Sequence, residues 1–296
     1  SLDFFQRHFH LAQRAVASKG YMEAITWSFT DDKINNNFLE NKQEIKIINP
    51  ISSELNVLRS SLYPNLIHFL KKNIDRGFEN QSLFEIGPSF IGNKPGQQIT
   101  VICGVKKEDL TDIYVIKKDV VQTLVELGIG KNETSIDVNT PSYYHPGRSG
   151  SIITKNDKKL LAYFGEIHPK IIDNTYGFEI FLENLVKYKS QNKKDKPTIT
   201  FSDYQKSDRD FAFVVQKNFK AQELIEIISN VDNSLIKNVK IFDVYEGENI
   251  PLDKKSIALK VTIQSDFKTL NEKDLNEISQ KIISNVEEKA SAKLRS

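Results

Sequence analysis

The chain has 296 residues, of which 39% are hydrophobic and 27% charged, so two domains or one large one with an ordinary core are expected. A formal net charge of only +2 argues against a uniformly basic nucleic-acid clamp and limits any such contact to a local surface. The single cysteine, Cys103, excludes an intramolecular disulfide and a paired-cysteine zinc site. No apolar run approaches the roughly 18 residues that span a bilayer, and no signal peptide is visible, so a cytoplasmic location is predicted.

The chain begins at Ser1 and its only methionine is Met22, so we expect a fragment of a longer protein. Periodicity and turn residues predict, in chain order, a helix at 3–19, strands at 25–29 and 56–59, a helix at 64–76, strands at 82–90 and 99–105, a helix at 120–127, strands at 136–138, 151–154 and 160–167, a short helix at 168–172 and a strand at 178–182. A Gly-Pro pair is expected to break the strand at 82–90, and residues 145–149 to form a turn. The turn at 155–159 predicts an antiparallel hairpin, so this part is α+β with a largely antiparallel sheet.

Residues 187–198 are polar and basic and carry no periodicity, which is typical of a linker. We therefore place a first domain at 1–188, a linker at 189–198 and a second domain at 199–296. The second domain is predicted to contain strands at 209–215, 236–245 and 256–264, helices at 221–230 and 271–290, and a last short strand at 293–295. This order is the ferredoxin-like split βαβ pattern, an α/β sandwich that leaves one face of its sheet uncovered.

Strand alternation places four residues on that uncovered face: Ala212, Asp243, Tyr245 and Ser256. An acid beside an aromatic ring suits single-stranded RNA, because the ring stacks on a base and the carboxylate accepts hydrogen bonds from a guanine edge. The small Ala212 and Ser256 would let a base approach closely. On its own, such a pair is more often a turn-proximal acid and a half-buried tyrosine.

One feature of the strand at 236–245 conflicts with this interpretation. Val239 and Ile241 have the same parity as Asp243, so simple alternation would place two apolar residues on the uncovered face. Either that face is partly covered at this end of the strand, or a β-bulge resets the register before Asp243.

Short motifs lie along the whole chain, and the most distinctive occupies residues 49–66. The others lie at 84–87, 145–149, 165–169, 209–212, 242–247, 255–258 and 294–295. In this order they resemble the C-terminal part of the β subunit of bacterial phenylalanyl-tRNA synthetase. The resemblance implies that the first domain is a catalytic-like domain, related to class II synthetase cores but chemically silent, which packs against the catalytic α subunit. It implies that the second domain is a ferredoxin-fold anticodon-binding domain.

In that family the residues matching Ala212, Asp243, Tyr245 and Ser256 contact the first anticodon base. The resemblance further implies a parent enzyme, an α2β2 heterotetramer, that attaches phenylalanine to tRNA-Phe with ATP and Mg²⁺. Its partners would be the α subunit and tRNA-Phe, with no DNA or membrane partner, and this chain would bind no cofactor or metal itself. Arg209 and Lys255 are candidate phosphate contacts, although ordinary solvated side chains explain them equally well.

An aminoacyl-adenylate site needs arginines near the phosphates and acids for Mg²⁺. The segments that should supply the arginines, 91–93 and 176–185, contain none, so no catalytic residue is assigned. His145 and His168 each precede a proline in a turn, and Cys103 lies in a core strand, so each is interpreted as structural. The remaining role for the first domain is a subunit interface. The first helix and the next strand offer apolar side chains for it: Phe4, Phe5, Phe9, Trp27 and Phe29. Taken singly, each of them is more often an ordinary core residue.

Two other functions remain open from the sequence. In one alternative, the first domain is an active class II ligase domain. In the other, the chain is a protein-interaction scaffold whose ferredoxin-like domain has no specific affinity for tRNA.

Overall fold

The computed structural model describes residues 3–191 and 202–295, and the chain divides into two compact units, Ser1–Asp195 and Lys196–Ser296. In the described parts of the chain, no helix is both long and apolar enough to cross a membrane. The elements of the first unit are α1 (Phe4–Ala17), β1 (Met22–Glu23), β2 (Phe29–Thr30), α2 (Asp32–Asn35), η1 (Asn36–Phe38), β3 (Ile45–Lys46), β4 (Val57–Leu58), α3 (Tyr63–Ile74), β5 (Gln81–Phe90), β6 (Gln98–Lys107), α4 (Ile113–Glu126), η2 (Lys131–Glu133), β7 (Thr134–Asp137), β8 (Tyr144–Thr154), β9 (Leu160–Ile167), β10 (Tyr176–Phe181) and α5 (Leu182–Gln191).

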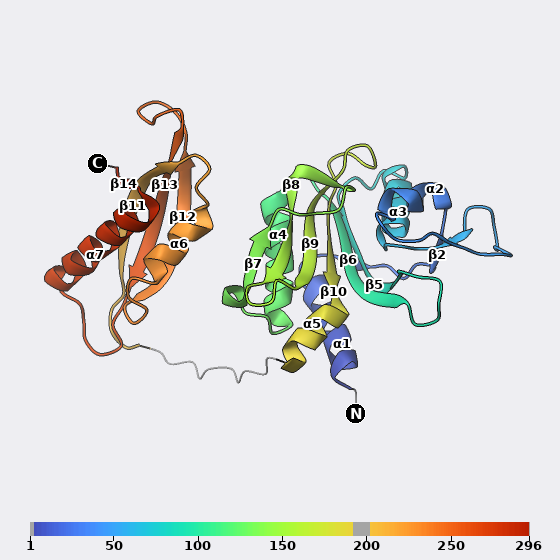
Figure 1. The fold of residues 1–296 in the computed structure, drawn as a ribbon, viewed down its shortest axis with the longest axis horizontal. Helices are drawn as coiled ribbons and strands as arrows, with labels where there is room; N and C mark the ends of the chain where they lie inside the picture. The colour runs from blue at the N-terminus through green and yellow to red at the C-terminus, as the bar shows by residue number, and fades with distance from the viewer. Residues whose placement is uncertain (1–2, 192–201, 296) are drawn as a thin grey trace. The chain divides into compact units, whose positions relative to one another are not determined.

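A seven-stranded sheet forms the centre of the first unit, in the order β1-β5-β6-β10-β9-β8-β7 (Figure 1). Its neighbouring strands are antiparallel except for the parallel pair β1 and β5. Helices α1, α4 and α5 bury one face of the sheet, and α3 packs over the other. A small sheet, β2-β4-β3, lies beside it. The predicted α+β class and the hairpin that joins β8 to β9 are therefore confirmed.

The predicted strand at 25–29 is wrong except at its end, because only Phe29 lies in a strand. Side chains bond two of its carbonyl groups, and the Arg59 amide donates to a third, that of Ser28, at 3.0 Å. Nδ2 of Asn65 donates to the Trp27 carbonyl at 2.6 Å and to the Phe29 carbonyl at 3.3 Å. Nη1 of Arg59 donates to the hydroxyl of Thr26 at 2.9 Å. The segment therefore crosses the surface as an irregular connection.

The predicted break in β5 is also wrong, since Gly87 and Pro88 continue the strand and Pro88 opposes Thr100 on β6. The reason is the neighbouring Arg59. A Cβ atom at position 87 would collide with its guanidinium, and the Pro88 carbonyl accepts a hydrogen bond from its Nε at 2.9 Å. Glycine thus provides space, and the proline carbonyl provides an acceptor, for one buried side chain.

Two other local predictions need correction. The turn expected at residues 145–149 lies inside the single strand β8, where the register against β9 shifts between Tyr144 and Ser149. Residues 168–172 form a turn and not a helix. The predicted linker, 189–198, starts inside α5, and its residues from 192 onward lie outside the described residues.

The second unit contains β11 (Ser207–Gln216), α6 (Ala221–Ser229), β12 (Ile236–Tyr245), β13 (Lys254–Ile263), α7 (Glu272–Ala290) and β14 (Lys293–Leu294). Its sheet has the antiparallel order β12-β13-β11-β14, and α6 and α7 pack on one face of it (Figure 1). Asn271 caps α7 by accepting a hydrogen bond from the Asp274 amide at 2.9 Å, as its position before the helix suggests. The predicted ferredoxin-like order is confirmed.

Candidate nucleic-acid interface

A bulge in β12 sets which side chains reach the face of the second sheet that α6 and α7 leave free. Ile241 opposes Leu259, which is fully buried beneath the helices. The register then shifts, so that Asp243 opposes Ala258. Phe242 is the extra residue, and it moves Asp243 to the opposite face from Ile241. Of the two explanations for the conflict in parity, the bulge is confirmed.

Two cross-strand rows follow from this register. Asp243, Ala258 and Ala212 form one row across β12, β13 and β11, and Tyr245, Ser256 and Val214 form the next. The structure thus gathers on one face all four residues that the sequence predicted for the base-binding site. Ala258 and Val214 belong to the same surface, and strand alternation alone identifies them.

The side chain of Asp243 is exposed and has no hydrogen-bond or ion-pair partner among the described residues. Its carboxylate oxygens are therefore open to a ligand. Tyr245 is 37% exposed, whereas Ser256 beside it is only 2% exposed. The surface thus combines a free acceptor, an aromatic ring and small side chains, which is the composition that single-stranded nucleic acid requires.

The two predicted phosphate contacts lie elsewhere. Arg209 has the same parity on β11 as the buried Phe211, so its side chain is on the face that the helices cover. Its Nη2 is 2.8 Å from the Glu272 carboxylate at the start of α7. Lys255 opposes Val215, which is 1% exposed and faces the helices. The register therefore assigns both cations to the face opposite Asp243.

Two contacts of Tyr245 were not anticipated from the sequence. The guanidinium carbon of Arg295 lies 5.3 Å from the centroid of the tyrosine ring. On another side, a Cβ atom on Gly247 would lie only 2.6 Å from the tyrosine hydroxyl. The short distance between Gly247 and Tyr245 in the sequence gives a weak indication of the first contact. The contact with Arg295 has no such indication, because it depends on the pairing of β14 with β11.

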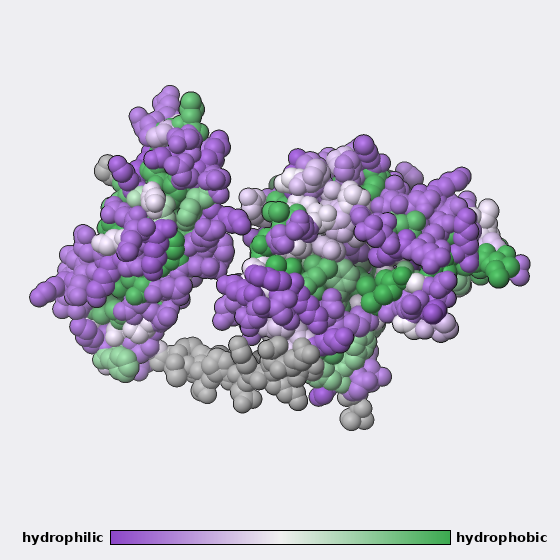
Figure 2. Space-filling model, in the orientation of Figure 1, coloured by the Kyte–Doolittle hydropathy of each residue, from purple (hydrophilic) through white to green (hydrophobic). Residues whose placement is uncertain are grey.

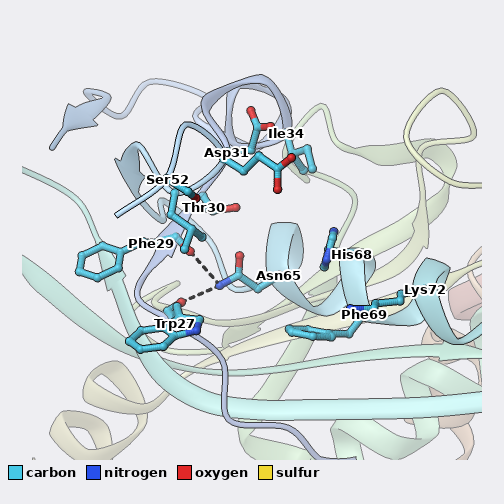
Figure 3. Close-up of a pocket in the computed structure, with 12 residues that line it drawn as sticks. Trp27, Phe29, Thr30, Asp31, Ile34, Ser52, Asn65, His68, Phe69 and Lys72 are labelled. Carbon is cyan, nitrogen blue, oxygen red and sulfur yellow. Dashed lines mark hydrogen bonds between the residues drawn. The ribbon is translucent and has the colours of Figure 1, made fainter. Parts of the chain in front are cut away.

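The first unit has an open pocket of about 410 Å³ beside α3, on the side where Figure 2 shows hydrophobic side chains among mainly hydrophilic ones. Trp27 and Phe29 form one wall of the pocket, with their rings stacked and the ring centroids 6.4 Å apart. Asn65, His68 and Phe69 line the pocket from α3 (Figure 3). Trp27 is 62% exposed. It is the clearest exposed aromatic among the five residues that the sequence offered for an interface.

The phenylalanines of α1 behave differently from Trp27. Phe5 and Phe9 pack against the main core of the first unit. Phe4 lies against the ring of His8, with 4.1 Å between the centroids. For Phe5 and Phe9 the ordinary core interpretation therefore holds.

Two reactive groups of the first unit, Arg59 and Cys103, are buried in its interior. Arg59 is 1% exposed and donates to Glu85, Thr26 and the Pro88 carbonyl, so its guanidinium is buried away from solvent in contacts within the chain. Cys103 is fully buried, and burial raises the pKa of its thiol well above the usual range, which suppresses the nucleophilic thiolate. These contacts are those of a structural core.

Comparison with known proteins follows the same division into a largely antiparallel α+β unit and a ferredoxin-fold unit. Residues 202–295 match the profile of the ferredoxin-fold anticodon binding domain. Residues 1–180 match the profile of the phenylalanyl tRNA synthetase beta chain CLM domain. The chain belongs to the phenylalanyl-tRNA synthetase β chain family.

Individual relatives agree with this assignment. The phenylalanine–tRNA ligase beta subunit of Paramagnetospirillum magneticum is 35% identical over 98% of this chain and 38% of its own length. That of Rickettsia bellii is 37% identical over 96% of this chain and 34% of its own length. The chain thus spans well under half the length of these relatives. A pyrrolysyl tRNA synthetase from Desulfitobacterium hafniense is a more distant structural neighbour, with a TM-score of 0.49 and 17% identity over 62% of this chain and 66% of that one.

Proposed function

We propose that this chain is the part of a phenylalanyl-tRNA synthetase β subunit that binds the anticodon of tRNA-Phe and supports the catalytic α subunit. The parent enzyme would be a cytoplasmic α2β2 ligase that attaches phenylalanine to tRNA with ATP and Mg²⁺. The observation that carries the proposal is the bulge at Phe242, which brings Asp243 and Tyr245 onto the same face as Ala212 and Ser256.

Each residue of this face would have a distinct role. Tyr245 would stack on the first anticodon base, because a tyrosine ring offers a flat apolar surface to any base. Asp243 would accept hydrogen bonds from the edge of a guanine, which presents N–H donors that adenine and pyrimidines do not arrange in the same way. Ala212 and Ser256 would leave room for the base plane between these two side chains.

The first unit would act as a scaffold. The buried Arg59, whose Nε and Nη1 donate to Pro88 and Glu85, supports this role, since an adenylate site needs an arginine that can reach a phosphate. The exposed Trp27 and the pocket beside it would form part of the contact with the α subunit. No catalytic group, metal or cofactor is assigned to this chain.

Binding to an anticodon stem-loop of tRNA-Phe tests the anticodon role. The full chain should prefer the cognate loop to a copy with the first anticodon base changed, and Tyr245→Ala should remove this preference, since stacking contributes about 1–3 kcal/mol per base. Equal weak binding to both loops by the full chain and by the variant would favour the scaffold without specific tRNA affinity. ATP–pyrophosphate exchange by the chain alone would favour the alternative of an active ligase domain.

A further inference from the structure

The ring of Tyr245 is not free in the structure. The guanidinium carbon of Arg295 lies 5.3 Å from its centroid, within the range of a cation–π contact. The two residues come from opposite edges of the sheet. Tyr245 lies on the edge strand β12, whereas the Arg295 amide donates to the Ala212 carbonyl on β11 at 2.7 Å, beside the other edge strand, β14. Strands β13 and β11 run between them. Their side chains therefore meet above these two central strands.

The burial of Ser256 agrees with this geometry. Ser256 lies on β13 next to Tyr245, on the face without helices, yet it is only 2% exposed. Ala258, two residues along on the same face, is partly exposed. Since no helix covers this face, the burial comes from neighbouring side chains, and Ser256 lies between Tyr245 on β12 and Val214 on β11.

Gly247 fixes the other end of the ring. A Cβ atom at this position would lie 2.6 Å from the Tyr245 hydroxyl and 2.8 Å from its Cζ, closer than real side chains approach. A side chain at this position would have to displace the ring. The tyrosine thus has Gly247 close to its hydroxyl end and Arg295 over its ring.

We propose that Arg295 is the second wall of the base-binding site, and that the first anticodon base inserts between its guanidinium and the ring of Tyr245. This inference rests on the proposed anticodon role. A guanidinium is planar and stacks on aromatic rings and on bases alike, so it exchanges one flat partner for another. In the free protein it occupies the place of the base.

Insertion requires the two groups to separate by about the 3.4 Å thickness of a stacked base. Arg295 is suited to this movement. Its side chain is long and exposed, and it follows β14, a strand of only two residues at the edge of the sheet. Tyr245, held against Gly247, would remain in place. The site would thus have one fixed wall and one adjustable wall.

The test uses the full chain and the unmodified cognate anticodon stem-loop of tRNA-Phe. Arg295→Ala should weaken cognate binding by about tenfold, because one stacking partner is lost. Arg295→Lys should weaken binding almost as much, since lysine keeps the charge but has no planar face. Lys289→Ala, which removes an exposed cation from α7, should bind as the unaltered chain does.

Full rescue by Arg295→Lys would overturn the inference, because it would show that charge alone matters, as in a phosphate contact. Unchanged or tighter binding by Arg295→Ala would also overturn it and would make Arg295 only a cover. Tyr245→Ala measured in parallel separates the two hypotheses. If Tyr245→Ala weakens binding and Arg295→Ala does not, only the second wall fails; if neither variant changes binding, the anticodon role itself fails.

Discussion

Arg59 and Glu85 form an ion pair of 2.8 Å in the interior of the first unit, where their side chains are 1% and 5% exposed. The pair joins β5 to the segment that precedes α3. Arg59 also bonds the Pro88 carbonyl and the hydroxyl of Thr26, so one guanidinium fixes three parts of the chain. Its position explains why β5 contains a glycine and a proline without being interrupted.

Removing one partner should strongly destabilise the first unit. Glu85→Ala leaves the buried guanidinium uncompensated, and breaking a buried pair in this way lowers the free energy of unfolding by about 3–5 kcal/mol. Denaturant unfolding, followed by the fluorescence of Trp27 in the first unit, measures the change. Glu126→Ala is the matched control. The side chain of Glu126 is 44% exposed, so its ion pair with Lys19 should contribute little to the free energy of unfolding. Equal effects of the two substitutions would contradict this account.

The buried tyrosines predict that the first unit loses stability in alkali. Burial raises the pKa of Tyr63 and Tyr144 well above the ordinary 10.0, and their hydroxyls are hydrogen-bonded to each other at 2.6 Å. Above pH 10 the unfolded chain releases these protons while the folded unit retains them. The stabilisation is therefore complete below pH 10 and decreases as the pH rises toward the folded pKa values.

Thermal unfolding of the first unit between pH 8 and pH 11 tests this dependence. Its unfolding temperature should fall as the pH passes about 10, the ordinary tyrosine pKa, and the fall should be smaller in Tyr144→Phe, which has one fewer group to titrate. An exposed tyrosine gives the control, since Tyr114 is 74% exposed and Tyr114→Phe should leave the slope unchanged. A slope that is the same in all three proteins would disprove the role of the buried hydroxyls.

The exposed Trp27 allows a direct test of the proposed contact with the α subunit. It is the only tryptophan of the chain, so its emission reports on its own surroundings. Adding the α subunit should shift this emission to shorter wavelength as water leaves the ring. Trp27→Ala should leave the stability of the unit almost unchanged, because the side chain is 62% exposed, but should weaken association by at least tenfold if it lies at the centre of the contact.

Leu110→Ala is a suitable control for that experiment, because Leu110 is 92% exposed and does not line the pocket beside Trp27. Association measured by sedimentation should be unaffected by this change. If Trp27→Ala assembles as well as the unaltered chain and the emission does not move, the contact lies on another surface of the unit.

The sequence alone predicts which face a residue occupies where the periodicity of one strand or helix determines that face. Alternation placed Phe211 and Phe213 beneath the helices and Ala212 on the free face, as observed. It also revealed the conflict between Ile241 and Asp243. Choosing the bulge required the pairing partners on β13, which no local pattern contains.

The errors at residues 25–29 and in β5 have a common physical origin, namely side chains that contact backbone far away in the chain. Asn65 and Arg59 bond the backbone near Trp27, more than 30 residues earlier, and so an alternating segment does not become a strand. Arg295 reaches Tyr245 only because β14 pairs with β11. Periodicity describes the burial of faces, but it carries no information on such contacts.

Gly247 gives the most local test of the free face. Gly247→Ala should displace the ring of Tyr245, since the new Cβ atom would lie 2.6 Å from its hydroxyl. The binding of the cognate anticodon stem-loop should weaken by about tenfold, because a misplaced ring loses most of its stacking on the base. Glu246→Ala controls for any disturbance of the loop, as its side chain is 45% exposed and pairs with Lys217 at the surface. Unaltered binding by Gly247→Ala, with Tyr245→Ala still defective, would mean that the ring tolerates the displacement and that its position is not set by this glycine.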